Sequence, residues 1–194
     1  MAMDILRAVI RQMISTTEEE LAGFLGPCRL QSFKKKDLLS QPGRIANEVF
    51  FIKKGMIRVM ITDLAGTEHT THFALENQFI ADYSSFLQNT PANYQLQALE
   101  DTDTVVLTRE AIEWGYKHMK EGEKIGRLIA EFYFTYLDNR IYSMYAKSPK
   151  ERYDHITQVF PNIHNRAPQH MIASYIGITA VHLSRLKKMD RAKL

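Results

Sequence analysis

The chain has 194 residues, of which 45% are apolar and 24% charged, and its formal net charge is +3. This is the composition of a globular protein with room for a sizeable core, and no apolar run is long enough to span a bilayer, so no membrane partner is expected. The single cysteine, Cys28, excludes an internal disulfide, a multi-cysteine zinc site and a cysteine-ligated iron–sulfur cluster.

The positive charge is concentrated in the C-terminal quarter of the chain. Residues 147–194 hold nine Lys/Arg and three Asp/Glu, whereas residues 1–146 hold 16 and 19. A basic end on a mildly acidic body is the asymmetry expected when only that end contacts nucleic acid.

The first residues, MAMDILRAVIRQMIS, look at first like a signal peptide. However, Asp4, Arg7 and Arg11 interrupt the apolar run, and the apolar residues recur in helical pairs. We therefore expect an amphipathic helix of a cytoplasmic protein. Thr17 and Glu20 form a capping-box pattern, which predicts a second helix over residues 18–25.

Residues 29–108 have the pattern of short strands separated by turn signals such as Gln41-Pro42-Gly43 and Lys54-Gly55. Many short strands with tight turns predict a sandwich or a small barrel. The expected strands are Arg29–Phe33, Asp37–Ser40, Val49–Lys53, Met56–Thr62, Glu68–Phe73, Gln78–Ala81, Tyr94–Ala98 and Thr104–Thr108.

From about Arg109 the pattern is helical. A short helix over residues 110–118 precedes a long one over residues 121–146, and a further helix is expected over Pro149–Phe160. The apolar stripe of the long helix is too wide for one neighbour, so we expect one side to cover the β part and the other to pair with a second copy. The stripe comprises Ile125, Leu128, Ile129, Phe132, Tyr136, Leu137, Ile141, Met144 and Tyr145.

The stretch from Pro168 to Lys188 has the residue types that two short crossing helices require. Ala173 allows a close approach, Gly177 can adopt the positive φ of a turn, and Leu183 pins the second helix against the first. Pro168 suits the first helical position, and Thr179 suits the N-cap of the second helix.

The outward face of this second helix carries side chains that suit the major groove and its phosphates: His182, Ser184, Arg185, Lys187 and Lys188. The alternative is an ordinary helical hairpin with a solvated basic face.

Three stretches resemble the Crp/Fnr family of bacterial transcription regulators: GRIANEVFFIKKGMIRVMI, SPKERYDHI and HMIASYIGITAVHLSR. The resemblance implies an α+β fold with a β-roll, or double-stranded jelly-roll-like, effector-sensing domain over residues 1–120. A dimerisation helix over 121–147 and a helix-turn-helix domain of reduced winged-helix type over 148–194 would follow. Its implied partners are a second copy, double-stranded DNA with a near-palindromic operator, an unidentified small-molecule effector and RNA polymerase. The implied DNA-binding residues are Gln169, Thr179, Ala180, His182, Ser184, Arg185, Lys187 and Lys188.

Departures from the family pattern limit what the resemblance implies. Members that bind cyclic nucleotides have a Gly-x-x-x-Gly-Glu segment followed by an arginine, and these positions include Asn77, Ala81, Asp82 and Ala92 here. Without the arginine a buried phosphate lacks its cation, so we expect no cyclic AMP or cyclic GMP binding. We expect an effector pocket near Ala81, Asp82, Tyr83, Ser84, Ala92, Asn93 and Tyr136, closed by Tyr83 and Tyr94 or holding a less charged ligand.

Two further departures concern DNA. The recognition helix begins with Ala180-Val181 where the family often has a polar pair, so the target sequence does not transfer. Few residues follow this helix, which leaves little room for a wing.

Two other functions were weighed. A cupin-like metalloenzyme would use His69, His72 and Glu76, but residues three apart on a strand point to opposite faces. We therefore expect solvated or paired histidines, no metal, no cofactor, no catalytic residues and no enzyme activity. A sensor or interaction module whose helical hairpin does not bind DNA is the second alternative.

Overall fold

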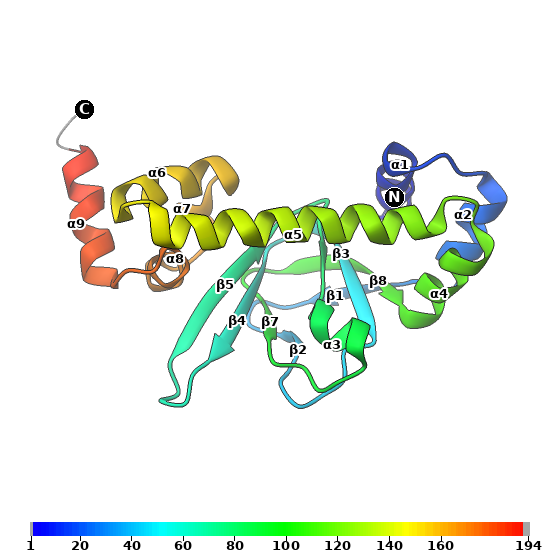
Figure 1. Ribbon diagram of the computed structural model, residues 1–194, viewed down its shortest axis with the longest axis horizontal. Coiled ribbons are helices and arrows are strands. Elements are labelled where there is room, and N and C mark those ends of the chain that lie inside the picture. Colours follow the sequence, from blue (N-terminus) through cyan, green and yellow to red (C-terminus); the bar gives the residue numbers. More distant parts are fainter. Residues whose placement is uncertain (1, 192–194) are drawn as a thin grey trace.

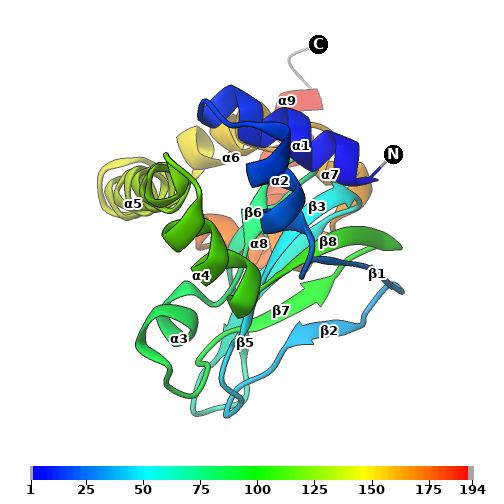
Figure 2. The ribbon, with the colours of Figure 1, turned by 90° about the vertical axis from the view of Figure 1, so that its right-hand side faces the viewer.

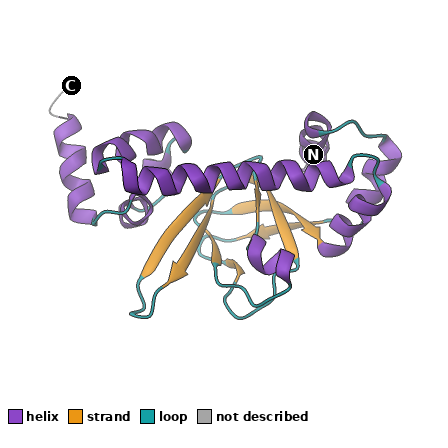
Figure 3. Cartoon of the chain, viewed as in Figure 1, coloured by secondary structure: helices purple, strands orange, loops and turns teal. Residues whose placement is uncertain are grey.

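The computed structural model describes residues 2–191. The strands lie in the middle of the molecule and the helices at its two ends (Figure 3). One long helix, α5 (Gly122–Ala146), runs along the β part and reaches the C-terminal helices, so it contacts both halves of the chain (Figure 1).

The β part is a roll of two four-stranded antiparallel sheets, with strand orders β1-β8-β3-β6 and β2-β7-β4-β5. Each expected strand region contains a strand, which confirms the β-roll. Apolar side chains such as Phe50, Ile57 and Leu96 fill the space between the sheets. The strands are β1 (Arg29–Phe33), β2 (Leu38–Ser40), β3 (Glu48–Lys54), β4 (Ile57–Thr62), β5 (Glu68–Ala74), β6 (Phe79–Ile80), β7 (Gln95–Ala98) and β8 (Thr102–Thr108).

Three helices cover one end of the roll: α1 (Ala2–Met13), α2 (Glu18–Leu25) and α4 (Arg109–His118). Leu6 and Ile10 of α1 are fully buried, as an amphipathic helix requires. The predicted capping box is present, because the Thr17 side chain accepts from Glu20 N and the Glu20 carboxylate accepts from Thr17 N. Local sequence therefore placed these helices correctly.

The two sides of α5 have different surroundings. Ile125 and Ile129 are buried against the roll, whereas Phe134, Leu137 and Ile141 are more than half exposed. Viewed along its axis, α5 lies at the edge of the molecule with the sheets to one side (Figure 2). The predicted division of its wide stripe into a covered and an uncovered side is therefore present in the single chain.

The C-terminal half comprises α6 (Pro149–Val159), α7 (Ile163–Arg166), α8 (Gln169–Ile176) and α9 (Ala180–Arg191). A second capping box, between Ser148 and Glu151, begins α6. Pro168 is the N-cap of α8 rather than its first helical residue, because its ψ of 143° keeps it extended. The sequence analysis did not anticipate α7 or the short α3 (Tyr83–Gln88).

The C-terminal half is packed against β5, which is the edge strand of its sheet. The Thr70 backbone N–H donates to Ser174 Oγ at 2.9 Å, and Phe73 belongs to the same buried cluster as Phe160 and Tyr175. Arg166 donates to Glu76 and Glu100 at the end of the roll, which fixes α7 there. The two halves thus share one buried apolar cluster.

Candidate nucleic-acid interface and effector pocket

The predicted crossing of two helices is present as α8, a turn at Gly177 and α9. Gly177 has φ +69°, and the Ile178 N–H donates to the Ala173 carbonyl, which closes the end of α8. Thr179 caps α9 through a hydrogen bond from His182 N to its hydroxyl. Leu183 and Leu186 are buried, so the opposite side of α9 faces outward.

The outward side of α9 presents donors together with exposed apolar residues, which include Val181 and Met189. Val181 is 63% exposed, which leaves an apolar contact beside the polar ones. Of the eight predicted DNA-binding residues, seven are exposed and Lys187 is half-buried. The exposed ones are Gln169, Thr179, Ala180, His182, Ser184, Arg185 and Lys188.

Lys187 and Lys188 point to different sides of α9, because successive helical residues are about 100° apart. Lys187 lies close enough to His164 of α7 for its charge to lower the pKa of that imidazole, after the larger effect of burial. Lys188 is exposed beside Arg185. Residues 192–194, where a wing would begin, lie outside the described part of the chain.

The predicted effector pocket is a cavity of about 210 Å³ between the roll and α5. Five predicted residues line it, whereas Ala92 and Asn93 do not. Ala92 is buried and hydrogen-bonded through its backbone to Arg44 and Gly43, so it is a structural residue. The lining residues are Val59, Thr71, His72, Ile80, Ala81, Asp82, Tyr83, Ser84, Tyr94, Tyr133, Tyr136 and Leu137.

Asp82, expected to face a ligand, has its carboxylate occupied by the backbone. Oδ1 accepts from Ser85 N at 3.1 Å, and Oδ2 accepts from Asn93 N and Tyr94 N at 3.0 and 3.1 Å. This carboxylate therefore caps α3 and ties it to the segment before β7. It also places an anion at the helix end where a phosphate would otherwise bind.

Among the residues that the structure describes, no lysine or arginine lines this pocket. Arg109, the nearest arginine downstream of Ala92, donates to the carbonyls of Ala46 and Phe86 and stacks on the Phe86 ring. Burial raises the pKa of the Tyr83, Tyr133 and Tyr136 phenols, so they remain neutral. The pocket is aromatic and contains no cation to balance a phosphate.

His72 was expected to be solvated or paired, and the structure shows that this is wrong. Its ring is only 6% exposed and lies 4.4 Å, centroid to centroid, from Tyr136. Neither ring nitrogen has a hydrogen-bond partner among the described residues. His69, three residues earlier, lies on the opposite face of β5, where it is half exposed and pairs with Asp63.

Two arginines missed by the sequence analysis hold the C-terminal half in place. Arg140 of α5 donates to the Tyr175 carbonyl at 2.6 Å and stacks on the Tyr175 ring. Arg152 of α6 donates to the carbonyls of Ile176, Met144 and Lys147. Both satisfy carbonyls at helix ends, a role that no local sequence pattern indicates.

Within residues 2–191 there is no group of three or more histidine, cysteine or acidic side chains placed to hold a metal ion. The described helices include none that is long and apolar enough to cross a membrane.

Residues 30–118 match the family model described as cyclic nucleotide-binding domain. FixK2 from Bradyrhizobium japonicum is 15% identical, with a TM-score of 0.73 over 86% of this chain and 85% of that one. The c-di-GMP-responsive global regulator CLP from Xanthomonas campestris is 10% identical, with a TM-score of 0.69 over 91% and 93%. A protein from Eubacterium rectale assigned to the Crp/Fnr family of transcriptional regulators is 14% identical, with a TM-score of 0.70 over 91% and 84%. No curated protein sequence matches the chain significantly.

Residues 30–118 thus match the cyclic nucleotide-binding domain model, and the chain has the fold of Crp/Fnr-type regulators. The resemblance seen in the sequence is thereby confirmed. CLP and the Eubacterium rectale protein, which share this fold, are regulators.

His72 should make the fold sensitive to acid. Burial lowers the pKa of its imidazole to about 3, and the charge of Arg140 acts in the same direction. The unfolded chain takes up this proton below about pH 6.5, so stability is intact above that pH and is lost as the pH falls toward 3. In the wild type the free energy of unfolding should fall as the pH is lowered from 6 to 4, and in His72→Phe this fall should be less steep. The difference in slope between the two proteins should be up to ~1.4 kcal/mol per pH unit. Urea unfolding across this range measures the slope, and an unchanged slope would contradict the assignment.

Proposed function

We propose that this protein is a dimeric, sequence-specific DNA-binding transcription regulator of the Crp/Fnr type. Residues 1–120 would form the sensor domain, 121–147 the dimerisation helix and 148–194 the DNA-binding domain. The observation that carries the proposal is the exposed side of α9, where Ser184, Arg185 and Lys188 stand on a helix held by a buried Leu183. This is the geometry with which a recognition helix enters a major groove.

The roles of the basic side chains follow from their positions. Arg185 lies in the middle of the exposed side and can form two hydrogen bonds with a guanine edge. Lys187 and Lys188 are flexible point charges, which suits them to phosphates. Val181, near the beginning of the helix, offers an apolar contact of the kind that a thymine methyl accepts.

Arg185→Ala should weaken binding to a specific site, selected beforehand from random DNA, by about 1–3 kcal/mol. Lys187→Ala and Lys188→Ala should each lower the slope of log affinity against log salt by about one. Fluorescence anisotropy at several salt concentrations measures both quantities. Lys117→Ala, an exposed lysine on α4, is the control and should bind like the wild type. If Arg185→Ala lowers the affinity for specific and for random DNA equally, Arg185 does not contact base edges.

Dimerisation through α5 is supported by its uncovered apolar side. Phe134, Leu137, Ile141 and Tyr145 follow a spacing of three or four residues and are 51–90% exposed in the single chain. Two parallel copies would bury this row and place two α9 helices about one DNA turn apart, which requires a near-palindromic operator.

At micromolar concentration, sedimentation of the wild type should give a molecular mass twice the 22.5 kDa of one chain. The double substitution Leu137→Glu and Ile141→Glu should give monomers, because four carboxylates would meet in the buried seam. Asn139→Glu, on another side of the same helix, should remain dimeric. A monomeric wild type would exclude both the dimer and the palindrome.

We further propose that the roll pocket excludes cyclic nucleotides and is either closed by Tyr83 and Tyr94 or occupied by a less charged molecule. The absence of a lining cation and the Asp82 carboxylate at the start of α3 support this. A hydrogen bond to a charged group contributes about 1.5–3 kcal/mol, and a buried phosphate without such partners costs more than that.

Calorimetric titration with cyclic AMP should show no binding tighter than ~1 mM, which corresponds to about −4 kcal/mol. Cyclic GMP should behave in the same way, because both share the phosphodiester. A micromolar dissociation constant for either would mean that a cation outside the described lining compensates the phosphate.

A further inference from the structure

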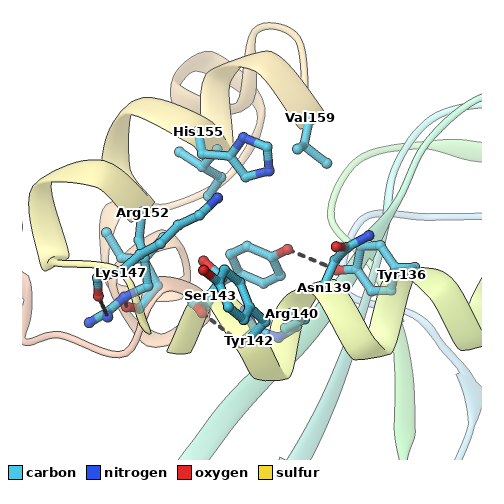
Figure 4. A pocket seen from close by; sticks show the side chains of 12 residues that line it. Tyr136, Asn139, Arg140, Tyr142, Ser143, Lys147, Arg152, His155 and Val159 are labelled. Atoms are coloured by element: carbon cyan, nitrogen blue, oxygen red, sulfur yellow. Dashed lines mark hydrogen bonds between the residues drawn. The ribbon is translucent and has the colours of Figure 1, made fainter. Parts of the chain in front are cut away.

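A second and larger pocket lies at the junction of α5, α6 and α8 (Figure 4). Its volume is about 370 Å³, within the range of small-molecule sites. The close-up shows side chains of α5 and α6 facing each other across the space. The lining residues are Tyr136, Asn139, Arg140, Tyr142, Ser143, Lys147, Arg152, His155, Ile156, Val159, Tyr175 and Ile176.

The charge of this lining has one sign. It includes Arg140, Lys147, Arg152 and His155, and no aspartate or glutamate. The nearest acidic residues of α6 are occupied elsewhere, since Glu151 accepts from Ser148 and Asp154 pairs with Lys150. Three fixed positive groups around one cavity without a balancing carboxylate favour a multiply charged anion.

The arginines are held in place but keep donors available. The interactions of Arg140 with α8 use Nη2, and those of Arg152 with helix-end carbonyls use Nε and Nη1. Among the described residues, Nη2 of Arg152, Nε and Nη1 of Arg140 and Nζ of Lys147 have no acceptor. Guanidinium groups fixed by packing lose little conformational freedom when they bind an anion.

We propose that this pocket binds a small organic phosphate. The phosphate would accept hydrogen bonds from Lys147 and from the remaining N–H groups of Arg152. The organic part would pack against Tyr142, Ile156 and Val159. A phosphate dianion fits better than a single carboxylate because three cations surround the space.

The pocket stays open if two chains pair through α5. The proposed dimer row includes Phe134, Ile141 and Tyr145, and the pocket residues Tyr136, Ser143 and Lys147 each follow one of them by two positions. Residues two apart on an α-helix are separated by about 200° around its axis. The pocket therefore lies on the side of α5 opposite to the row.

The ligand would contact the groups that position the turn before the recognition helix. Arg140 and Arg152 hold the carbonyls of Tyr175 and Ile176, the last two residues of α8, and Gly177 follows directly. Binding should therefore be detectable at the amides of this turn as well as in the pocket.

The test is an NMR titration of the ¹⁵N-labelled full chain with 5′-AMP, with pyrophosphate, and with adenosine as the uncharged control. Both phosphates should shift the amide resonances of Ser143, Lys147 and Gly177. The affinity for adenosine should be at least about tenfold lower than that for 5′-AMP, because adenosine lacks the charge-assisted hydrogen bonds. No binding by either phosphate, or equal binding by adenosine and 5′-AMP, would overturn the proposal.

Two lysine variants separate this pocket from the other basic surface of the chain. Lys147→Gln should weaken 5′-AMP about tenfold, and Lys188→Gln, on the exposed side of α9, should leave it unchanged. The reverse result would mean that the anion binds the recognition helix, and it would overturn the proposal. Shifts confined to residues 81–84 would place 5′-AMP in the roll pocket and would overturn it as well.

Discussion

One row of side chains on α5 sets how the two halves of this protein are arranged. Tyr133 donates its hydroxyl to the Phe79 carbonyl in the roll, and the Tyr136 hydroxyl meets that of Tyr175 in α8 at 2.9 Å. One turn further, Arg140 donates to the Tyr175 carbonyl and stacks on its ring. Because buried polar groups must find partners, moving α8 away from α5 would leave several of them unsatisfied. The positions of α8 and of α9, which follows it, therefore depend on this row.

The same row connects the roll pocket with the helix-turn-helix. Tyr136 lines the pocket with its ring and contacts α8 with its hydroxyl, and His72 lies against Tyr136 and Phe160. A molecule in the pocket would therefore be separated from α8 by one side chain, that of Tyr136. The contact between Thr70 and Ser174 adds a second connection, at the open edge of β5. These contacts form a contiguous connection between the roll pocket and α8.

The two pockets beside α5 differ in charge, and this difference separates their ligands. The roll pocket is lined by tyrosines and by a carboxylate that is already occupied, so a phosphate would meet an anion without a cation. The pocket beside α6 has cations without acids. Although residues 30–118 match the cyclic nucleotide-binding domain model, the described lining of the roll pocket holds no lysine or arginine to balance a phosphate.

The sequence by itself determined what depends on neighbours in the chain. Period-two alternation and turn glycines placed eight strands, a capping box placed α2, and Gly177 placed the turn between α8 and α9, because these signals are local. Only the tertiary structure decided the roles of Asp82, His72, Arg140 and Arg152. Asp82 is satisfied by amides up to 12 residues away, Arg140 by a carbonyl 35 residues away, and His72 is buried against Tyr136 of α5. Contacts at such separations leave no periodic pattern in the sequence, so the shape and charge of both pockets appear only once the chain is folded.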